Sequence, residues 1–303
     1  MTVIATFYKF VSLPDVETVQ DWLRSHCEAL HLKGTILLAT EGINGTVAGE
    51  RSAIDDLMDV LRSDERLADI TARESMADAP PFERMRVRIR AEIVPLGLPE
   101  ISPVDQVGTY VAPQDWNQLI TDPDVLLIDT RNEYEVAIGT FQGAKNPKTH
   151  NFREFTHYAQ KLDPQQHRKI AMFCTGGIRC EKATAYLRTQ GFEEVYHLKG
   201  GILNYLETVE PEQSLWQGEC FVFDQRVAVT HGMEVGSHQM CLACGHPITE
   251  ADQRSPQYEL GVSCPHCCDR LSEEQKSHYR ERRRQRRLAR QHAPRQPAPI
   301  NPT

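Results

Sequence analysis

The stretch KIAMFCTGGIRCEKATAYLRTQG, residues 169–191, places a cysteine between an apolar run and a helix-like run. Residues 169–174 have the character of a buried parallel strand, and the helix predicted over 179–191 ends at Gly191, a residue typical of helix ends. Further strands are predicted at 125–130 and 194–201, and helices at 132–138 and 202–209. Because strands and helices alternate, residues 123–218 are expected to form a small doubly wound α/β domain.

The loop between the strand and the helix has the composition of an anion-binding site. Cys174 stands at the carboxyl end of a predicted central strand, where open α/β sheets bind ligands. Gly176 and Gly177 allow backbone N–H groups to turn inward, and the helix that follows adds its positive N-terminal end. With the charge of Arg179, this arrangement favours a thiolate with a pKa below the usual ~8.5. The plainer alternative is a buried structural cysteine beside a glycine turn.

The size of the loop narrows the chemistry. Four residues separate Cys174 from Arg179, whereas phosphatase loops that wrap a phosphate have five. Cys180 occupies the position of the phosphatase arginine, so phosphoryl transfer is disfavoured. Cys180 itself is either a packed side chain or a resolving thiol. The predicted active-site loop therefore consists of Cys174, Thr175, Gly176, Gly177, Ile178 and Arg179.

The N-terminal segment, residues 1–100, has the element order β-α-β-β-α-β of a ferredoxin-like α+β domain. Strands are predicted at 2–11 and 83–94, with two more in 34–49 around a turn at Asn44-Gly45. Helices are predicted at 16–32 and 52–64, the second with Ser52 as its N-cap. Residues 101–122 are expected to be a linker, because the stretch 95–122 is loose and contains prolines at 95, 99, 103 and 113.

The segment 219–275 is rich in cysteine. Cys241 and Cys244 form one CxxC pair and Cys264 and Cys267 another, 19 residues further on. Four thiolates at this spacing are typical of a structural zinc site in a segment too small for a core of its own. The alternative is packed reduced thiols without a metal. Additional candidate ligands are Cys220, Cys268, His246 and His266.

Charge is distributed unevenly along the 303 residues. The net charge is −8, but the part from Asp269 onward carries ten Lys/Arg and four Asp/Glu, a net of +6. Such a basic tail, here 276–303, favours a polyanionic partner such as RNA, and the candidate contacts are Arg282, Arg283, Arg284, Arg286 and Arg287. The alternative is a solubilising tail. Under either reading, residues 290–303 are expected to be disordered.

Several sequence signals that would indicate a membrane, a secretory route or a cofactor are not evident. Apolar runs stay short of the ~20 residues that a membrane span needs, and no secretory signal is evident. The nine cysteines are therefore expected to be reduced thiols in the cytoplasm. A glycine-rich dinucleotide motif and a histidine–carboxylate iron site are not evident either.

The stretch LIDTRNEYEVAIGTFQGAKNP (127–147) and the loop CTGGIR (174–179) resemble the rhodanese domain. This resemblance implies that Cys174 carries a persulfide bound by the loop amides, with Asp129 and Arg131 as supporting residues and Glu135 in the following helix. Thr140 departs from the family, in which many members have histidine.

Three further motifs extend the resemblance to most of the chain. EGINGT (41–46), FCTGGIRCEKA (173–183) and HLKGGI (197–202), with the CxxC pairs, resemble the bacterial tRNA uridine(34) hydroxylase family. That resemblance implies formation of 5-hydroxyuridine in the anticodon loop, with dioxygen as co-substrate and an essential Cys174. The loop by itself also fits a sulfurtransferase that passes persulfide sulfur to a thiol or to tRNA. How dioxygen is activated is not evident from the residues.

Overall fold

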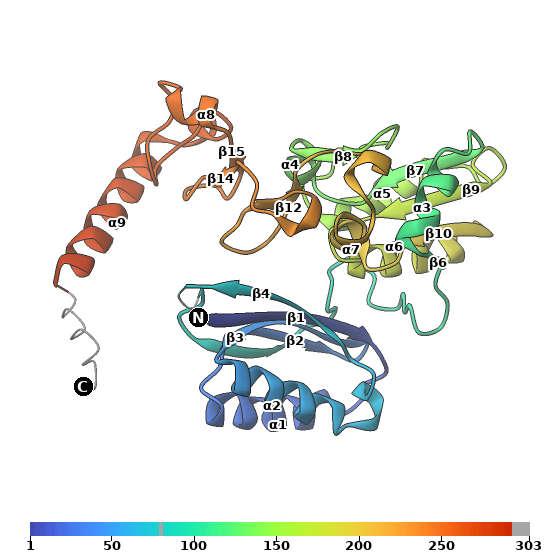
Figure 1. Ribbon diagram of the computed structural model, residues 1–303, viewed down its shortest axis with the longest axis horizontal. Coiled ribbons are helices and arrows are strands. Elements are labelled where there is room, and N and C mark those ends of the chain that lie inside the picture. Colours follow the sequence, from blue (N-terminus) through green and yellow to red (C-terminus); the bar gives the residue numbers. More distant parts are fainter. Residues whose placement is uncertain (79–80, 293–303) are drawn as a thin grey trace. The chain divides into compact units, whose positions relative to one another are not determined.

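The computed structural model describes residues 1–78 and 81–292, without the side chains of 286 and 289–292. The chain divides into a unit of residues 1–235 and a second unit that begins at Gly236. Figure 1 shows the elements of both units in sequence colours. Within the described ranges, no helix is long and apolar enough to cross a membrane.

The N-terminal domain is a five-stranded sheet in the order β4-β1-β3-β2-β5. The first four strands follow the predicted ferredoxin-like order, and β5 adds to the edge parallel to β2. Helices α1 and α2 cover one face of the sheet (Figure 1), and their apolar sides share its core. The elements are β1 (Thr2–Phe10), α1 (Val16–Ala29), β2 (Lys33–Ala39), β3 (Gly42–Gly49), α2 (Arg51–Arg62), β4 (Ala72–Ala77) and β5 (Met85–Ile89).

Four details of this domain differ from the sequence-based expectation. The hairpin does not turn at Asn44-Gly45, because Ala39 pairs with Gly42 and leaves Thr40 and Glu41 as the loop. A turn at Asn44 would break β3, which pairs along its whole length with β1 as well as β2. Ser52 is not an N-cap, since α2 begins one residue earlier. The strand predicted at 83–94 is the short β5, and β4 was not predicted.

The second domain is built on a parallel sheet in the order β6-β10-β9-β7. Alternate residues of β9 enter two cores: Ile170 and Met172 pack on one side of the sheet, and Ala171 and Phe173 on the other. Helices therefore cover both faces, as expected for a doubly wound domain. The elements are β6 (Thr109–Val111), α3 (Pro113–Ile120), β7 (Val125–Asp129), α4 (Glu133–Val136), β8 (Gly139–Phe141), α5 (Phe155–Ala159), β9 (Lys169–Phe173), α6 (Ile178–Thr189), β10 (Glu194–Leu198) and α7 (Gly201–Thr208).

Part of the predicted linker 101–122 belongs to this second domain. Strand β6 pairs with β10, and Trp116 of α3 is completely buried in the core beside β9. After α7 the chain returns to the same domain through short strands, the first of which pairs with β8. These strands are β11 (Trp216–Gly218), β12 (Cys220–Phe221) and β13 (Ala228–Val229).

The second unit is small and is organised around cysteines. Its buried cluster consists of Ile248 and three of the cysteines of the CxxC pairs, with Tyr258 and Leu271 packed against it. The basic run lies on a long helix that includes residues 290–292, which were expected to be disordered. Residues 293–303 of the predicted disordered tail lie outside the described residues. The elements are β14 (Gln239–Met240), β15 (Pro247–Ile248), α8 (Glu250–Arg254) and α9 (Glu273–His292).

Candidate active site at Cys174 and candidate metal site

The loop after β9 turns its backbone toward the sulfur of Cys174. Gly177 is the N-cap of α6, with φ at 104°, and its N–H donates to Cys174 Sγ over 3.1 Å. A residue with a side chain at position 177 would have to adopt the left-handed backbone conformation, and its Cβ would lie 2.8 Å from the Tyr8 hydroxyl. The glycine is therefore required both for the turn that directs the N–H inward and for the approach of the N-terminal domain.

Cys174 is 1% exposed, yet its thiol is acidic. Burial by itself raises the pKa of a thiol, but three neighbours act in the opposite direction. The Cys180 thiol donates a hydrogen bond to Cys174, Arg179 contributes its charge, and the N–H groups of Cys180 and Gly177 point at the sulfur. Together they lower the pKa of Cys174 to about 6. The sulfur is therefore a thiolate at neutral pH, as the loop composition predicts.

Cys180 is a completely buried side chain on the first turn of α6. Its sulfur lies 3.4 Å from the Thr130 hydroxyl. Burial, followed by the hydrogen bond to Cys174 and the charge of the thiolate, raises the pKa of Cys180. Cys180 thus remains a neutral thiol that donates a hydrogen bond to its charged neighbour.

Arg179 does not point freely at a ligand, because its charge is paired. Its two terminal nitrogens donate to the two carboxylate oxygens of Glu135, each over 2.7 Å. Glu135 is completely buried and belongs to α4, which follows the β7 strand. This bidentate pair fixes the guanidinium beside the loop, so Arg179 acts on the sulfur through its field and also orients α4.

Asp129 and Arg131 form a completely buried ion pair below the loop. The Arg131 Nη2 lies 2.6 Å from Asp129 Oδ2, and the same oxygen accepts a hydrogen bond from Thr140 over 2.8 Å. Arg131 also donates to the carbonyl of Gly139. Thr140 thus donates a hydrogen bond to the supporting residue Asp129. It does so from the position where many rhodanese domains have histidine.

The start of α7 closes the far side of the loop. The N–H groups of Ile202 and Leu203 donate to the carbonyls of Cys174 and Thr175 over 3.0 and 3.1 Å. Gly201 has φ at 66°, and a Cβ there would lie 2.5 Å from both carbonyl oxygens. The HLKGGI motif therefore contains glycine at the point where two backbones touch.

Two tyrosines and a glutamate beside the loop were not predicted from the sequence. Glu181 of α6 accepts a hydrogen bond from the Tyr8 hydroxyl over 2.8 Å and another from Tyr110. Burial raises the pKa of Glu181 to about 7, against the lowering effect of the two hydroxyls and with the Cys174 charge adding to the rise. Tyr8 lies in β1 of the N-terminal domain, so both domains build the site.

Family models match both domains of the first unit. Residues 2–93 match the model described as the UPF0176 acylphosphatase like domain, and residues 112–208 match the model of the rhodanese-like domain. Cys174 and its loop are therefore part of a rhodanese-like domain. The chain carries an acylphosphatase-like domain of ferredoxin type, then the rhodanese-like domain, then the cysteine-rich region.

Three solved structures that are similar to parts of this protein each cover about a third of the chain. A BLUF protein, BlrB, is 26% identical, covers 33% of this chain and 82% of its own, and has a TM-score of 0.28. A rhodanese-related protein from Thermoplasma volcanium is 21% identical over 34% of this chain and 95% of its own, with a TM-score of 0.29. An acylphosphatase from Coxiella burnetii is 21% identical over 29% and 92%, with a TM-score of 0.23.

Lys182 joins the rhodanese-like domain to the N-terminal domain. This completely buried side chain lies 2.5 Å from Glu41 Oε2 and 2.7 Å from Glu92 Oε1. Glu92 in turn accepts the N–H groups of Leu96, Gly97 and Leu98. The motifs EGINGT and FCTGGIRCEKA, far apart in the sequence, therefore meet through Glu41 and Lys182.

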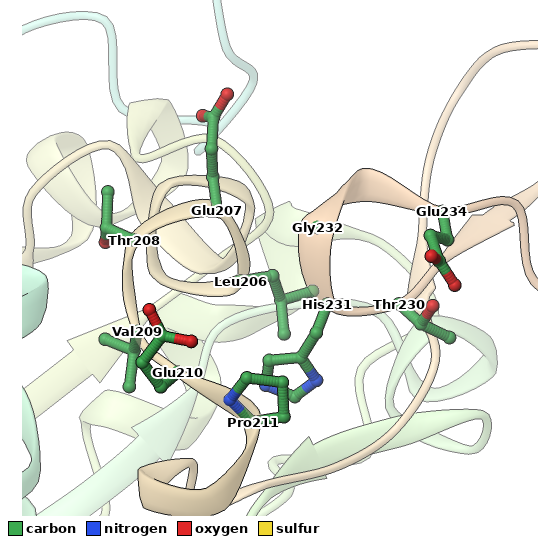
Figure 2. A pocket seen from close by; sticks show the side chains of 10 residues that line it. All are labelled: Leu206, Glu207, Thr208, Val209, Glu210, Pro211, Thr230, His231, Gly232 and Glu234. Atoms are coloured by element: carbon green, nitrogen blue, oxygen red, sulfur yellow. The ribbon is translucent and has the colours of Figure 1, made fainter.

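Two hollows of the first unit differ in their chemistry. One, of about 950 Å³, is lined by Tyr8, Tyr110, Gly176, Glu181 and Lys199, among others, and so reaches the rhodanese-like loop. The other, of about 480 Å³, contains Glu207, Glu210 and Glu234 but no residue of the loop. Figure 2 shows these carboxylates around the second hollow, whose lining contains no lysine or arginine. The first hollow shares Glu207 with it, but there four carboxylates are accompanied by four lysine or arginine side chains. The first hollow is therefore the candidate substrate site.

The four cysteines of the two CxxC pairs converge in the second unit. The Sγ atoms of Cys241, Cys244, Cys264 and Cys267 all lie within 4.8 Å of one another. Two of these separations are 3.8 Å, from Cys244 to Cys264, and 3.7 Å, from Cys264 to Cys267. A tetrahedral zinc with Zn–S bonds of ~2.3 Å requires sulfurs ~3.8 Å apart, so the donor set fits a structural zinc ion.

The additional candidate ligands are not part of this cluster. Cys220 is buried in β12 of the first unit, and Cys268 is only partly buried. His246 and His266 stack on each other with ring centroids 3.9 Å apart. The four thiols of the CxxC pairs alone supply the four ligands that a structural zinc site needs.

The arginines predicted to contact RNA lie along α9. Arg283, Arg284 and Arg287 are exposed, whereas Arg282 is partly buried, with its guanidinium 4.8 Å from the ring centroid of Tyr279. Arg284 has only a distant ion pair with Glu281, at 3.6 Å. The side chain of Arg286 lies outside the described part.

Proposed function

We propose that this protein hydroxylates C5 of the uridine at wobble position 34 of tRNA, with dioxygen as oxidant and with Cys174 as the essential thiolate. One observation carries the proposal: the low-pKa Cys174 loop borders a hollow to which both domains contribute. The resemblance of the sequence motifs supports the same reaction, and two of those motifs are joined by the Glu41–Lys182 ion pair.

The reaction defines what the site must provide. Replacing the C5 hydrogen by a hydroxyl group with dioxygen consumes two electrons and two protons from a reductant and releases one water molecule. In this proposal Cys174 supplies a negatively charged sulfur, and the N–H of Gly177 with the paired Arg179 stabilises that charge. The buried Asp129–Arg131 ion pair holds the end of β7 in place beside the Cys174 loop.

The proposed partner is the anticodon loop of tRNA in the cytoplasm. Exposed arginines on α9 suit phosphate oxygens and would give salt-dependent, sequence-independent contact. Sequence-specific recognition of RNA uses unpaired bases, and the hollow beside the rhodanese-like loop has room for one. The zinc proposed for the second unit would be structural, since four thiolates leave no open position.

A second candidate function is sulfur transfer. Four residues between Cys174 and Arg179, with the Gly177 N–H directed at the sulfur, suit a persulfide as well as a thiolate. In that reaction an acceptor thiolate attacks the outer sulfur of a Cys174 persulfide. A new persulfide forms on the acceptor, the S–S bond of the Cys174 persulfide breaks, and the Cys174 thiolate is the leaving group.

Mass spectrometry of tRNA nucleosides separates the two functions. Cells that lack this gene are complemented with wild type or with Cys174→Ser. Loss of 5-hydroxyuridine and its derivatives, restored only by wild type, is the expected result. Loss of a thiolated nucleoside instead would establish sulfur transfer, and unchanged nucleosides in the deleted strain would refute both.

A further inference from the structure

Glu181 differs from the other buried carboxylates of the first unit. Among the described residues it has no cationic partner, and it accepts hydrogen bonds from the hydroxyls of Tyr8 and Tyr110. Every other buried carboxylate is paired with a buried cation: Glu41 and Glu92 with Lys182, Asp129 with Arg131, and Glu135 with Arg179. Burying a carboxylate without a cationic partner, here at 9% exposure, costs free energy. We therefore expect a ligand that donates a hydrogen bond to Glu181.

The hollow next to Glu181 has an aromatic wall. Tyr110 of β6 is 46% exposed, and its ring lies 4.1 Å, centroid to centroid, from that of His197. His197 is almost completely buried behind it and is neutral, because burial lowers its pKa to about 4. An exposed tyrosine ring held from behind by a second ring is suited to stacking against a flat base.

One cation on the rim is available to a ligand. The hollow is also lined by Lys9, Arg73 and Arg226, and each of these is paired with a carboxylate. Lys199, in contrast, is exposed and has no ion pair among the residues that the structure describes. The surface therefore combines one buried acceptor, one aromatic face and one unpaired cation.

We propose that this hollow binds a single unstacked uridine nucleotide, whose N3–H donates to Glu181, whose base stacks on Tyr110 and whose phosphate lies beside Lys199. The proposal rests on the RNA substrate of the proposed function. The volume of about 950 Å³ is in the range of small-ligand sites. Because the acid that reads the base belongs to α6, the recognised base would lie next to the Cys174 loop.

The acceptor selects among bases. Uracil carries a hydrogen on N3, whereas the corresponding ring nitrogens of cytosine and adenine are acceptors. Because burial raises the pKa of Glu181 to about 7, binding is compared at pH 8, where this acid is mostly ionised. A hydrogen bond to the ionised group discriminates by about tenfold when its donor is removed. Glutamine at position 181 retains an acceptor oxygen and alanine has none, so the two variants separate recognition from the mere size of the side chain.

The test measures binding of hairpin RNAs that carry uridine, 3-methyluridine or cytidine at one loop position. Wild type is expected to prefer uridine by about tenfold. Glu181→Gln should keep a smaller preference, because its amide is neutral and its NH2 can donate to N3 of cytidine, and Glu181→Ala should lose most of the preference. Glu210→Gln, in the hollow of Figure 2, is the matched carboxylate-to-amide control and should bind as wild type does. Thermal melting confirms that each variant is folded.

Photo-crosslinking locates the base. A hairpin with 4-thiouridine at the same position should crosslink to peptides that contain Tyr8 or Tyr110. Crosslinks confined to other peptides, or a Glu181→Ala variant that keeps the preference for uridine, would overturn the pocket. If the nucleoside assay is negative but the N3-dependent preference remains, the pocket stands and the proposed hydroxylation does not. Absence of hairpin binding overturns the pocket.

Discussion

Cys174 combines complete burial with an acidic thiol, and this combination depends on directed donors rather than on solvent. The N–H groups of Gly177 and Cys180, the Cys180 thiol and the Arg179 charge all favour the thiolate. Water would stabilise any exposed thiolate without specificity. A buried thiolate held by fixed donors keeps its charge and is screened from most competing reagents.

The pH at which Cys174 ionises can be measured directly. Because its pKa is lowered to about 6, the thiolate is present above that pH and is lost as the pH falls through it. The absorbance at 240 nm, taken as wild type minus Cys174→Ser, should rise through a midpoint near pH 6. A midpoint near the ordinary value of ~8.5 would contradict the role of the loop donors.

Substitutions at Gly201 and Gly143 can be compared to measure the close contact between the start of α7 and the Cys174 loop. Both have positive φ, at 66° and 81°, but a Cβ at Gly143 would meet no atom within 4 Å. Alanine at Gly143 should cost only the backbone strain, about 1 kcal/mol. Alanine at Gly201 should cost clearly more, because it also separates α7 from the loop.

Chemical denaturation measures both variants. The free energy of unfolding should fall further for Gly201→Ala than for Gly143→Ala. Equal losses would show that the contact between the start of α7 and the loop carbonyls contributes little.

At the scale of elements, the two CxxC pairs act as the core of the second unit. Apart from Ile248, the buried residues of its described cluster are cysteines, so few apolar contacts hold these short elements together. Small segments of this kind depend on a metal for stability. The fit of the sulfur separations to a tetrahedron supports zinc.

Metal content tests this. Protein purified without chelator should contain about one equivalent of zinc, and Cys241→Ser should lose most of it. Cys268→Ser is the control, because Cys268 lies outside the four-sulfur cluster, and it should retain the metal. Less than ~0.5 equivalents in wild type would contradict the site.

At the scale of the whole molecule, α6 connects two domains. Glu181 faces Tyr8, and the next residue, Lys182, binds Glu41 and Glu92. Burial raises the pKa of Glu41, while the Lys182 hydrogen bond and backbone donors hold that of Glu92 below its usual value despite burial. A buried cation between two carboxylates specifies one domain arrangement more than it adds stability.

Removing the Lys182 charge leaves two buried carboxylates facing each other. Lys182→Met should therefore lower stability by about 3–5 kcal/mol, measured by chemical denaturation at pH 7. Lys161→Met, at an exposed position without an ion pair among the described residues, should change it by less than about 0.5 kcal/mol. A loss of under 1 kcal/mol for Lys182→Met would refute the bridging role.

Local patterns in the sequence determined a large part of this protein. The strand–loop–helix around Cys174, the alternation that gives a doubly wound domain and the zinc-like spacing of four cysteines all depend on neighbours along the chain. The turn at Asn44-Gly45 was predicted incorrectly, because pairing of β3 on both sides outweighs a local turn preference.

Only the tertiary structure decided which residues surround the sulfur. Tyr8 and Glu181 are 173 positions apart, and Glu41 and Lys182 are 141 apart. Nothing in a helix sequence distinguishes Glu181 and Lys182 from solvent-exposed charges, since burial and pairing arise only when the N-terminal sheet packs beside α6. The sequence therefore determined the reactive loop, and the packing of two domains determined the hollow that this loop faces.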